Sequence, residues 1–105
     1  MDVRNNQEGI QEAKQEIQEG ADALIIKPGL YGLDLLARLK DQVEVPLLSY
    51  HVSGEYAMLK TASEKGFLSF EKGLWESLMV LKRGGASGII TYGAQEMARL
   101  LEQMK

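Results

Sequence analysis

The stretch "ADALIIKPGLYGLDLL", residues 21–36, contains the clearest indication of the fold. Its apolar run, residues 23–26, is short and leads directly into Lys27 and then a Pro-Gly pair. A short apolar run that ends in this way is typical of a strand buried on both faces, as in a parallel sheet. We therefore predict a strand over 22–27 that carries an amine at its carboxyl end.

The rest of the chain alternates between helical and strand patterns. Strands are expected at 22–27, 43–50 and 87–92, and helices at 6–20, 32–42, 53–66, 70–85 and 94–105. This order, α-β-α-β-α-α-β-α, predicts three parallel strands joined by right-handed helical crossovers. Ser53 and Ser69 are expected to cap two of the helices, and Gly20 and Gly66 to end two. We expect one α/β domain over residues 1–105, with both edges of its sheet unpaired unless another chain covers them.

Composition limits the kinds of partner that the chain can have. With 105 residues, 45% of them apolar and 26% charged, it has the profile of one small folded domain. A net charge of −3 argues against attraction to nucleic acid or to an anionic membrane. There is no cysteine for a disulfide or thiolate metal site, no signal peptide pattern and no apolar run long enough to span a bilayer. These features predict a cytoplasmic protein.

Side chains capable of chemistry follow all three predicted strands. The carboxyl ends of parallel strands lie along one edge, so Lys27, Tyr50 and Tyr92 should gather there, with His51 and Ser53 just beyond. A lysine that is shielded from water loses its charge more easily and can then attack a ketone. Phenols and the start of a helix can bind a carboxylate. The predicted edge therefore has the groups needed to hold a keto acid.

Each of these residues also has a purely structural interpretation. Lys27 could extend into solvent or pair with Asp22 or Asp34. Ser53 could act only as a helix cap, and a lone histidine such as His51 is more often structural than a base or ligand. One histidine without cysteines or paired carboxylates does not favour a metal site, and the glycines form neither a GxGxxG nor a P-loop motif.

Three blocks of sequence, "ADALIIKPG", "SYHVSGEYAMLK" and "ASGIITYGAQ", together resemble the C-terminal third of porphobilinogen synthase (5-aminolevulinate dehydratase). The opening "MDVRN" is similar to the family segment before the preceding helix, so the resemblance covers practically the whole chain. It implies a TIM barrel, of which this chain would supply the last three strands. It also implies a lyase of heme and tetrapyrrole biosynthesis, which condenses two molecules of 5-aminolevulinate.

The resemblance implies a role for individual residues. Lys27 matches the lysine that forms a Schiff base with the first 5-aminolevulinate, and Ser53 and Tyr92 match residues that bind the carboxylate of that substrate. Tyr50 matches a tyrosine that lines the same pocket. The resemblance places a second active-site lysine, the arginines of the second-substrate site and the ligands for zinc or magnesium outside this sequence. We therefore expect no metal or other cofactor in this chain.

These implications define what we expect the chain to do. It should keep much of one substrate site and be inactive alone in the full reaction, so a complementing N-terminal barrel chain or further copies would supply the rest. We expect a homo-oligomer that covers the sheet edges and the apolar inner face. Two alternatives remain open: a non-catalytic module that binds 5-aminolevulinate or docks onto a full-length synthase, and an inactive fragment.

Overall fold

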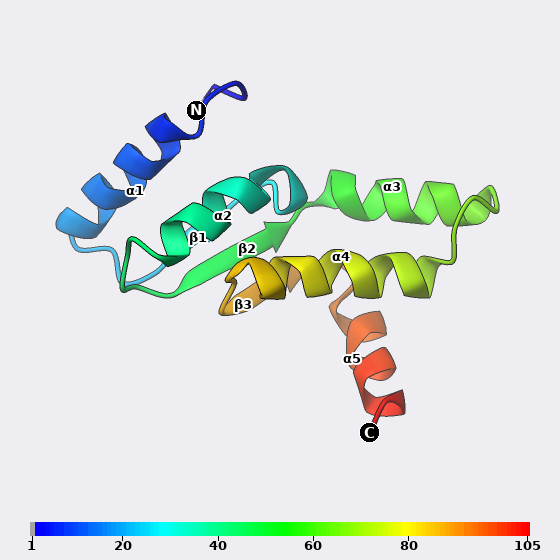
Figure 1. Cartoon of the computed structure of the whole chain (residues 1–105). Coiled ribbons are helices and arrows are strands. Elements are labelled where there is room, and N and C mark those ends of the chain that lie inside the picture. The colour runs from blue at the N-terminus through cyan, green and yellow to red at the C-terminus, as the bar shows by residue number, and fades with distance from the viewer. Residues whose placement is uncertain (1) are drawn as a thin grey trace.

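The computed structural model describes residues 2–105, which form one sheet and the helices that pack on it (Figure 1). In chain order the elements are α1 (Gln7–Gln18), β1 (Leu24–Ile26), the short 3₁₀ helix η1 (Leu30–Gly32), α2 (Leu33–Lys40), β2 (Leu47–His51), α3 (Ser53–Glu64), α4 (Phe70–Gly84), β3 (Gly88–Thr91) and α5 (Ala94–Gln103). The predicted succession of helices and strands is confirmed. The strands are shorter than expected, and the second starts only after Pro46, which cannot donate a hydrogen bond to a sheet.

The three strands form one parallel sheet in the order β1-β2-β3, as predicted. The register pairs Leu24 with Leu47 and Leu48 with Gly88. Helix α2 connects the first two strands, and the α3–α4 pair connects the second to the third. All three strands therefore have their carboxyl ends at the same end of the sheet, which we call the carboxyl edge.

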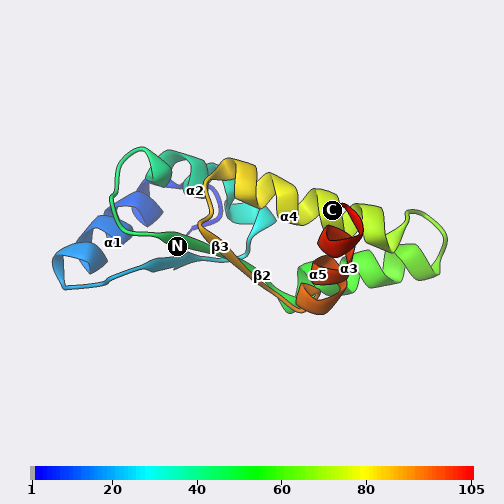
Figure 2. The same ribbon diagram turned by 90° about the horizontal axis from the view of Figure 1, so that it is seen from below.

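One face of the sheet is covered by helices. Helices α1, α2 and α4 lie on the same side of the strands, and the α3–α4 hairpin extends beyond the sheet (Figure 2). The buried apolar side chains form two clusters. One contains Ile10, Leu24, Ile26, Leu36, Leu39 and Leu47, and the other contains Leu74, Leu78 and Leu81 of α4 with Met97 of α5. Full burial of each such side chain contributes about 1.5–3 kcal/mol, so this helix-covered face holds the fold together.

The opposite face of the sheet is not covered, and the prediction that the strands are buried on both faces is wrong for this chain. Ile25 is 54% exposed and Ile90 is 41% exposed, while Leu48 and Tyr50 are half-buried. The register places Ile25 beside Leu48 and Tyr50 beside Ile90, so the four side chains form one continuous surface. We call this surface the open face. Its residues are as apolar as a core, but none of the helices described here packs on it.

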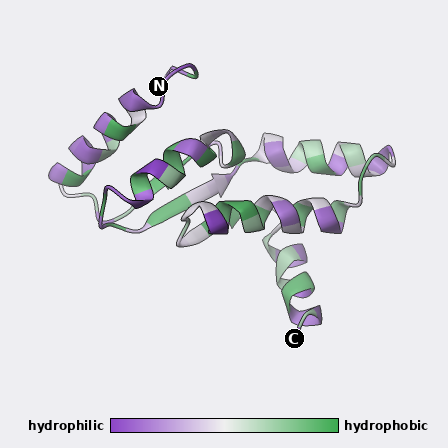
Figure 3. Cartoon of the chain, viewed as in Figure 1, coloured by the Kyte–Doolittle hydropathy of each residue, from purple (hydrophilic) through white to green (hydrophobic). Residues whose placement is uncertain are grey.

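The helix ends largely follow the local sequence. The backbone of Gly20 (φ +106°) and of Gly66 (φ +79°) takes the left-handed conformation just after α1 and α3, as expected for glycines that end helices. Ser69 caps α4, because its Oγ accepts the N–H of Lys72 at 3.3 Å. Helix α1 is mostly hydrophilic (Figure 3) and buries only a thin stripe that includes Ile10. Over residues 2–105, no helix has the length and apolar character needed to cross a bilayer.

Candidate active site

The ends of the three strands bring the predicted site residues to one edge of the sheet. Lys27 directly follows β1, Tyr50 is the penultimate residue of β2, and Tyr92 directly follows β3. Ser53 is the first residue of α3, two positions after the end of β2. The observed parallel topology places these four positions at the same end of the strands.

The two phenols, Tyr50 and Tyr92, lie near enough to affect one another electrostatically. Hydrogen bonding between Tyr50 and Tyr92 raises the pKa of the Tyr50 phenol, and the repulsion between two ionised phenols and partial burial act in the same direction. A phenol hydroxyl can donate a hydrogen bond to an anion. Tyr92 is 59% exposed, so the pair is open to solvent and to a ligand.

The Lys27 amine is exposed, and the expectation that it is shielded from water is wrong for this chain by itself. The segments that border Lys27 leave its side chain exposed, as the open face is exposed, because no described helix packs over it. Pairing with Asp22 or Asp34 does not occur either: Asp34 instead accepts a hydrogen bond from Asn6 at 2.9 Å. Within the described part of the chain, the amine has no ion-pair partner that would occupy it.

Ser53 does not cap α3, contrary to the prediction. The N-cap is Val52, which has an extended backbone and no side-chain acceptor, and Ser53 is the first helical residue with its side chain exposed. The N–H of Val52 is bound instead by the carboxylate of Glu55, at 2.8 Å. Among the described residues, the Ser53 hydroxyl has no hydrogen-bond partner, and it is exposed at the first turn of α3.

Glu55 is the residue of the site that the sequence analysis missed. Its carboxylate is buried, with 3% of the residue exposed, and it accepts two more backbone N–H groups, those of Gly29 at 3.2 Å and Leu30 at 2.6 Å. These two residues belong to the loop that follows Lys27. One buried side chain thus connects the loop after β1 to the start of α3. A glutamate three positions after an N-cap is a known capping signal, and this spacing could have indicated half of the role.

The loop after β1 is also held by close packing. A Cβ on Gly29 would lie 3.0 Å from the backbone oxygen of Tyr50 and 3.2 Å from Oγ of Ser49. The loop therefore runs directly over the end of β2, and only a residue without a side chain fits without displacement. This packing fixes where the preceding residue, Lys27, leaves the sheet.

His51 has a structural position, in agreement with the plainer of its two interpretations. The ring is fully buried, at 0% exposure, and Nδ1 lies 2.9 Å from Oγ1 of Thr91. That oxygen accepts the N–H of Gly93 at 3.1 Å, so its hydroxyl can donate to Nδ1. Burial lowers the pKa of His51, and the charge of Glu55 offsets part of this effect. The neutral ring joins the end of β2 to the turn that carries Tyr92.

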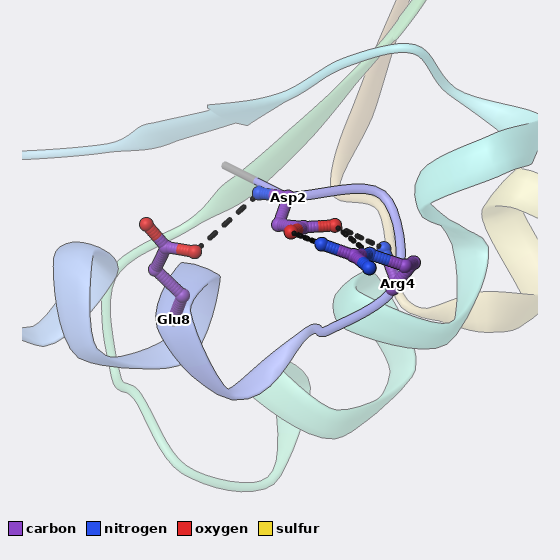
Figure 4. Close-up of polar contacts among 3 residues, drawn as sticks. All are labelled: Asp2, Arg4 and Glu8. Atoms are coloured by element: carbon purple, nitrogen blue, oxygen red, sulfur yellow. Dashed lines mark hydrogen bonds and ion pairs between the residues drawn. The ribbon is translucent and has the colours of Figure 1, made fainter.

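The N-terminal segment forms the remaining wall near Lys27. Asp2 and Arg4 form an ion pair at 2.8 Å, and the backbone N–H of Asp2 lies 3.4 Å from Oε2 of Glu8 (Figure 4). This segment and the loop after β1 line a hollow of about 550 Å³ that also includes Lys27 and Tyr31. This hollow borders Lys27 but is not lined by Tyr50, Ser53 or Tyr92.

A metal ion in a protein needs several ligand side chains close together. Among residues 2–105, no group of three or more histidine, aspartate or glutamate side chains comes together in a way that could hold an ion. The groups that the described strand ends bring together are an amine, hydroxyls and the backbone N–H groups at the start of a helix.

Together, the fold and the site define a class: a segment of a parallel α/β barrel, with an accessible lysine at the end of one strand and hydroxyl groups at the ends of the next two. A sequence model of the delta-aminolevulinic acid dehydratase family matches residues 1–100. The chain belongs to this family, which confirms the resemblance seen in its sequence.

Individual relatives agree over almost the whole chain. The delta-aminolevulinic acid dehydratase of Halalkalibacterium halodurans is 42% identical over 105 residues, which are 100% of this chain and 32% of the relative. The enzyme of Archaeoglobus fulgidus is 41% identical over 102 residues, which are 97% of this chain and 31% of the relative. The chain thus spans about a third of the length of these curated relatives.

A solved structure matches at the level of the backbone. The delta-aminolevulinic acid dehydratase (porphobilinogen synthase) of Toxoplasma gondii, in complex with the reaction product porphobilinogen, superposes with a TM-score of 0.92 at 46% identity. The match covers 95% of this chain and 28% of that one. The three parallel strands and their helices therefore correspond to a part of the porphobilinogen synthase barrel.

Proposed function

We propose that this chain provides the first-substrate half of a 5-aminolevulinate dehydratase site, within cytoplasmic tetrapyrrole biosynthesis. Lys27 forms a Schiff base with the ketone of 5-aminolevulinate, Ser53 and Tyr92 bind its carboxylate, and Tyr50 lines the pocket. The observation that carries the proposal is the position of an unpaired Lys27 at a strand end, on the same sheet edge as Ser53 and the tyrosine pair, in a member of this family. The Toxoplasma relative, described with porphobilinogen bound, supports a small-molecule site.

Schiff-base formation requires mainly that the amine and the carboxylate-binding groups are correctly placed. The neutral amine attacks the ketone carbon, the carbinolamine loses water, and a C=N bond to the lysine nitrogen remains. The two phenol hydroxyls and the start of α3 offer hydrogen bonds to the acid group of the substrate. Burial favours the neutral form of an amine, so the reaction gains from any element that covers the open face and the end of β1.

The open face motivates the second half of the proposal, which concerns assembly. It presents Ile25 and Ile90 to solvent beside the unpaired edges of β1 and β3. Exposed apolar side chains and free strand edges favour association. We expect copies of this chain to associate through this face, and full activity to require further barrel strands from a longer polypeptide or a complementing chain.

The same face favours a second candidate function, a module that docks onto a full-length synthase without catalysing the reaction. A mixing experiment distinguishes this candidate. Docking predicts a complex with full-length synthase in size-exclusion chromatography even after Lys27→Ala, together with no adduct at Lys27 in the unmodified chain.

Trapping of the Schiff base tests the proposed function directly. The chain is incubated with 5-aminolevulinate and borohydride, and the modified residue is located by peptide mass analysis. The expected result is an adduct at Lys27 that is lost in Lys27→Ala but kept in Lys14→Ala, a matched change of an exposed lysine on α1. Labelling spread evenly over the lysines, or total labelling that Lys27→Ala leaves unchanged, would contradict the proposal.

A further inference from the structure

Glu55 combines burial with an unusually large share of the backbone donors around it: three N–H groups. It is almost completely buried, and its carboxylate serves three backbone donors from two different loops. Oε2 accepts from Val52 and Gly29, and Oε1 accepts from Leu30. Only the first of these donors belongs to the entry of its own helix.

The electrostatics of this contact depend on backbone groups alone. In the described structure, no lysine or arginine forms an ion pair with Glu55. Burial of an unpaired carboxylate is strongly unfavourable, so the three N–H groups must replace its lost hydration. The donors are the N–H of Val52, which is the N-cap of α3, and those of Gly29 and Leu30 at the start of η1.

The two loops that this carboxylate joins each carry one end of the proposed substrate site. Gly29 and Leu30 follow Lys27 by two and three residues, and Val52 directly precedes Ser53. A movement of Glu55 therefore changes the separation between the amine and the carboxylate-binding group. The side chain itself is buried beneath the loops, so it acts through them rather than on a ligand.

We propose that Glu55 is a positioning residue that sets the distance between Lys27 and Ser53 and thereby selects ketones that carry a carboxylate at a matching distance. This inference rests on the proposed function. The inference has a specific consequence. Loss of the hydrogen bonds that Glu55 accepts from the two loops should impair the reaction of Lys27 with a keto acid and leave its reaction with a plain ketone unchanged. A defect confined to folding or to the reactivity of the amine would affect both alike.

Glu55→Gln is the most informative substitution, because it keeps the size of the side chain. An amide has one acceptor oxygen and one NH₂ group, which cannot accept a hydrogen bond. At least one of the three backbone N–H groups would then face another donor. Glu64→Gln, an exposed position at the other end of α3, is the matched control.

The experiment compares levulinate with 2-butanone, which is the same ketone without the carboxylate group. In each case the lysine nitrogen bonds to the ketone carbon, water leaves, and borohydride delivers hydride to the C=N bond to give a stable secondary amine at Lys27. The rate of trapping at Lys27 is measured by peptide mass analysis against ketone concentration. We expect Glu55→Gln to lower the preference for levulinate at least tenfold, while 2-butanone reacts at the wild-type rate and Glu64→Gln behaves as wild type.

The possible failures separate the inference from the proposed function. If the unmodified chain shows no preference for levulinate at Lys27, the proposed function is refuted. If the unmodified chain shows the preference and Glu55→Gln retains it, only the positioning role is refuted. Should Glu55→Gln not fold, Glu55→Asp keeps the charge but is one methylene shorter, and it should also lose preference. Full preference in a folded Glu55→Asp, or loss of folding in both variants, would overturn the positioning role.

Discussion

Gly29→Ala should destabilise the chain through a single close contact. The backbone of Gly29 has φ −58° and ψ −64°, which alanine adopts without strain, so conformational freedom is not at issue. The added methyl group would lie 3.0 Å from the backbone oxygen of Tyr50 and 3.1 Å from a methyl group of Leu81. The leucine can adjust, but the Tyr50 oxygen belongs to the central strand of the sheet, so the loop must shift instead.

The size of the effect follows from two contributions. Overpacking of a tight site costs about 1–3 kcal/mol. The shift also lengthens the bond from Gly29 N–H to Glu55, which at 3.2 Å is already the longest of the three. Together we expect a loss of about 2 kcal/mol in the free energy of unfolding, and each kcal/mol lowers the Tm of a domain of this size by about 4–8 °C.

Urea unfolding followed by circular dichroism measures this difference. The matched control is Gly54→Ala, since Gly54 lies in the first turn of α3 and a Cβ there meets nothing within 4 Å. Alanine should stabilise the helix at that position by about 0.5–1 kcal/mol. The reasoning would be refuted by a Gly29→Ala chain that unfolds at the wild-type urea concentration or above it.

Three further predictions concern the sheet and its edge. Thr91→Val removes the partner of His51 Nδ1 and of the Gly93 N–H and should cost about 1–3 kcal/mol in urea unfolding, whereas Thr91→Ser should retain most of the stability; equal losses in both variants would contradict this. Burial lowers the pKa of His51 in the folded state, so the contribution of His51 to stability is complete above about pH 6.5 and is lost as the pH falls through that value toward the lowered pKa. Urea unfolding midpoints measured between pH 8 and pH 5 test the sign of this effect. A His51 contribution that grows on acidification would be inconsistent with a buried neutral ring. Ile90→Lys on the open face should weaken self-association in light scattering, while Val3→Lys, at a side chain that is 99% exposed on the N-terminal segment, should not; a monodisperse monomer in the unmodified chain would remove the basis for this expectation.

The order of elements could be read from the sequence because local signals are strong in this chain. Residues 24–26 are purely apolar, Gly20 and Gly66 end helices in the conformation that glycine favours, and Ser69 caps the helix that it precedes. The edge that carries Lys27 also follows from a general property of parallel sheets. These features depend on neighbours in sequence or on topology, which the pattern alone reveals.

The solvent exposure of the site could not be read in the same way. Ile25 and Leu24 look alike in sequence, yet only Leu24 is covered, because the helices described here pack on one face. The apolar pattern of the strands indicates a second layer of structure over the open face, and residues 2–105 do not supply that layer. The same apolar pattern predicts that Lys27 is shielded from water. Its exposure, like that of Ile25, arises because the sheet is covered on one face alone among residues 2–105.

Glu55 was missed for a different reason. In a helical pattern rich in polar residues, a glutamate is normally on the solvated side, and the local capping spacing accounts only for its contact with Val52. Its burial depends on Gly29 and Leu30, which lie more than twenty residues away in the chain and approach only after the loop folds over the end of β2. Long-range contacts of this kind leave no periodic signal in one sequence.

A crystal structure of the chain reduced with borohydride in the presence of levulinate would test the central claim most directly. The account predicts continuous electron density from Nζ of Lys27 to the former ketone carbon, with the ligand carboxylate in contact with Ser53 and Tyr92. Density on other lysines alone, or a ligand on Lys27 whose carboxylate points away from both hydroxyls, would contradict it.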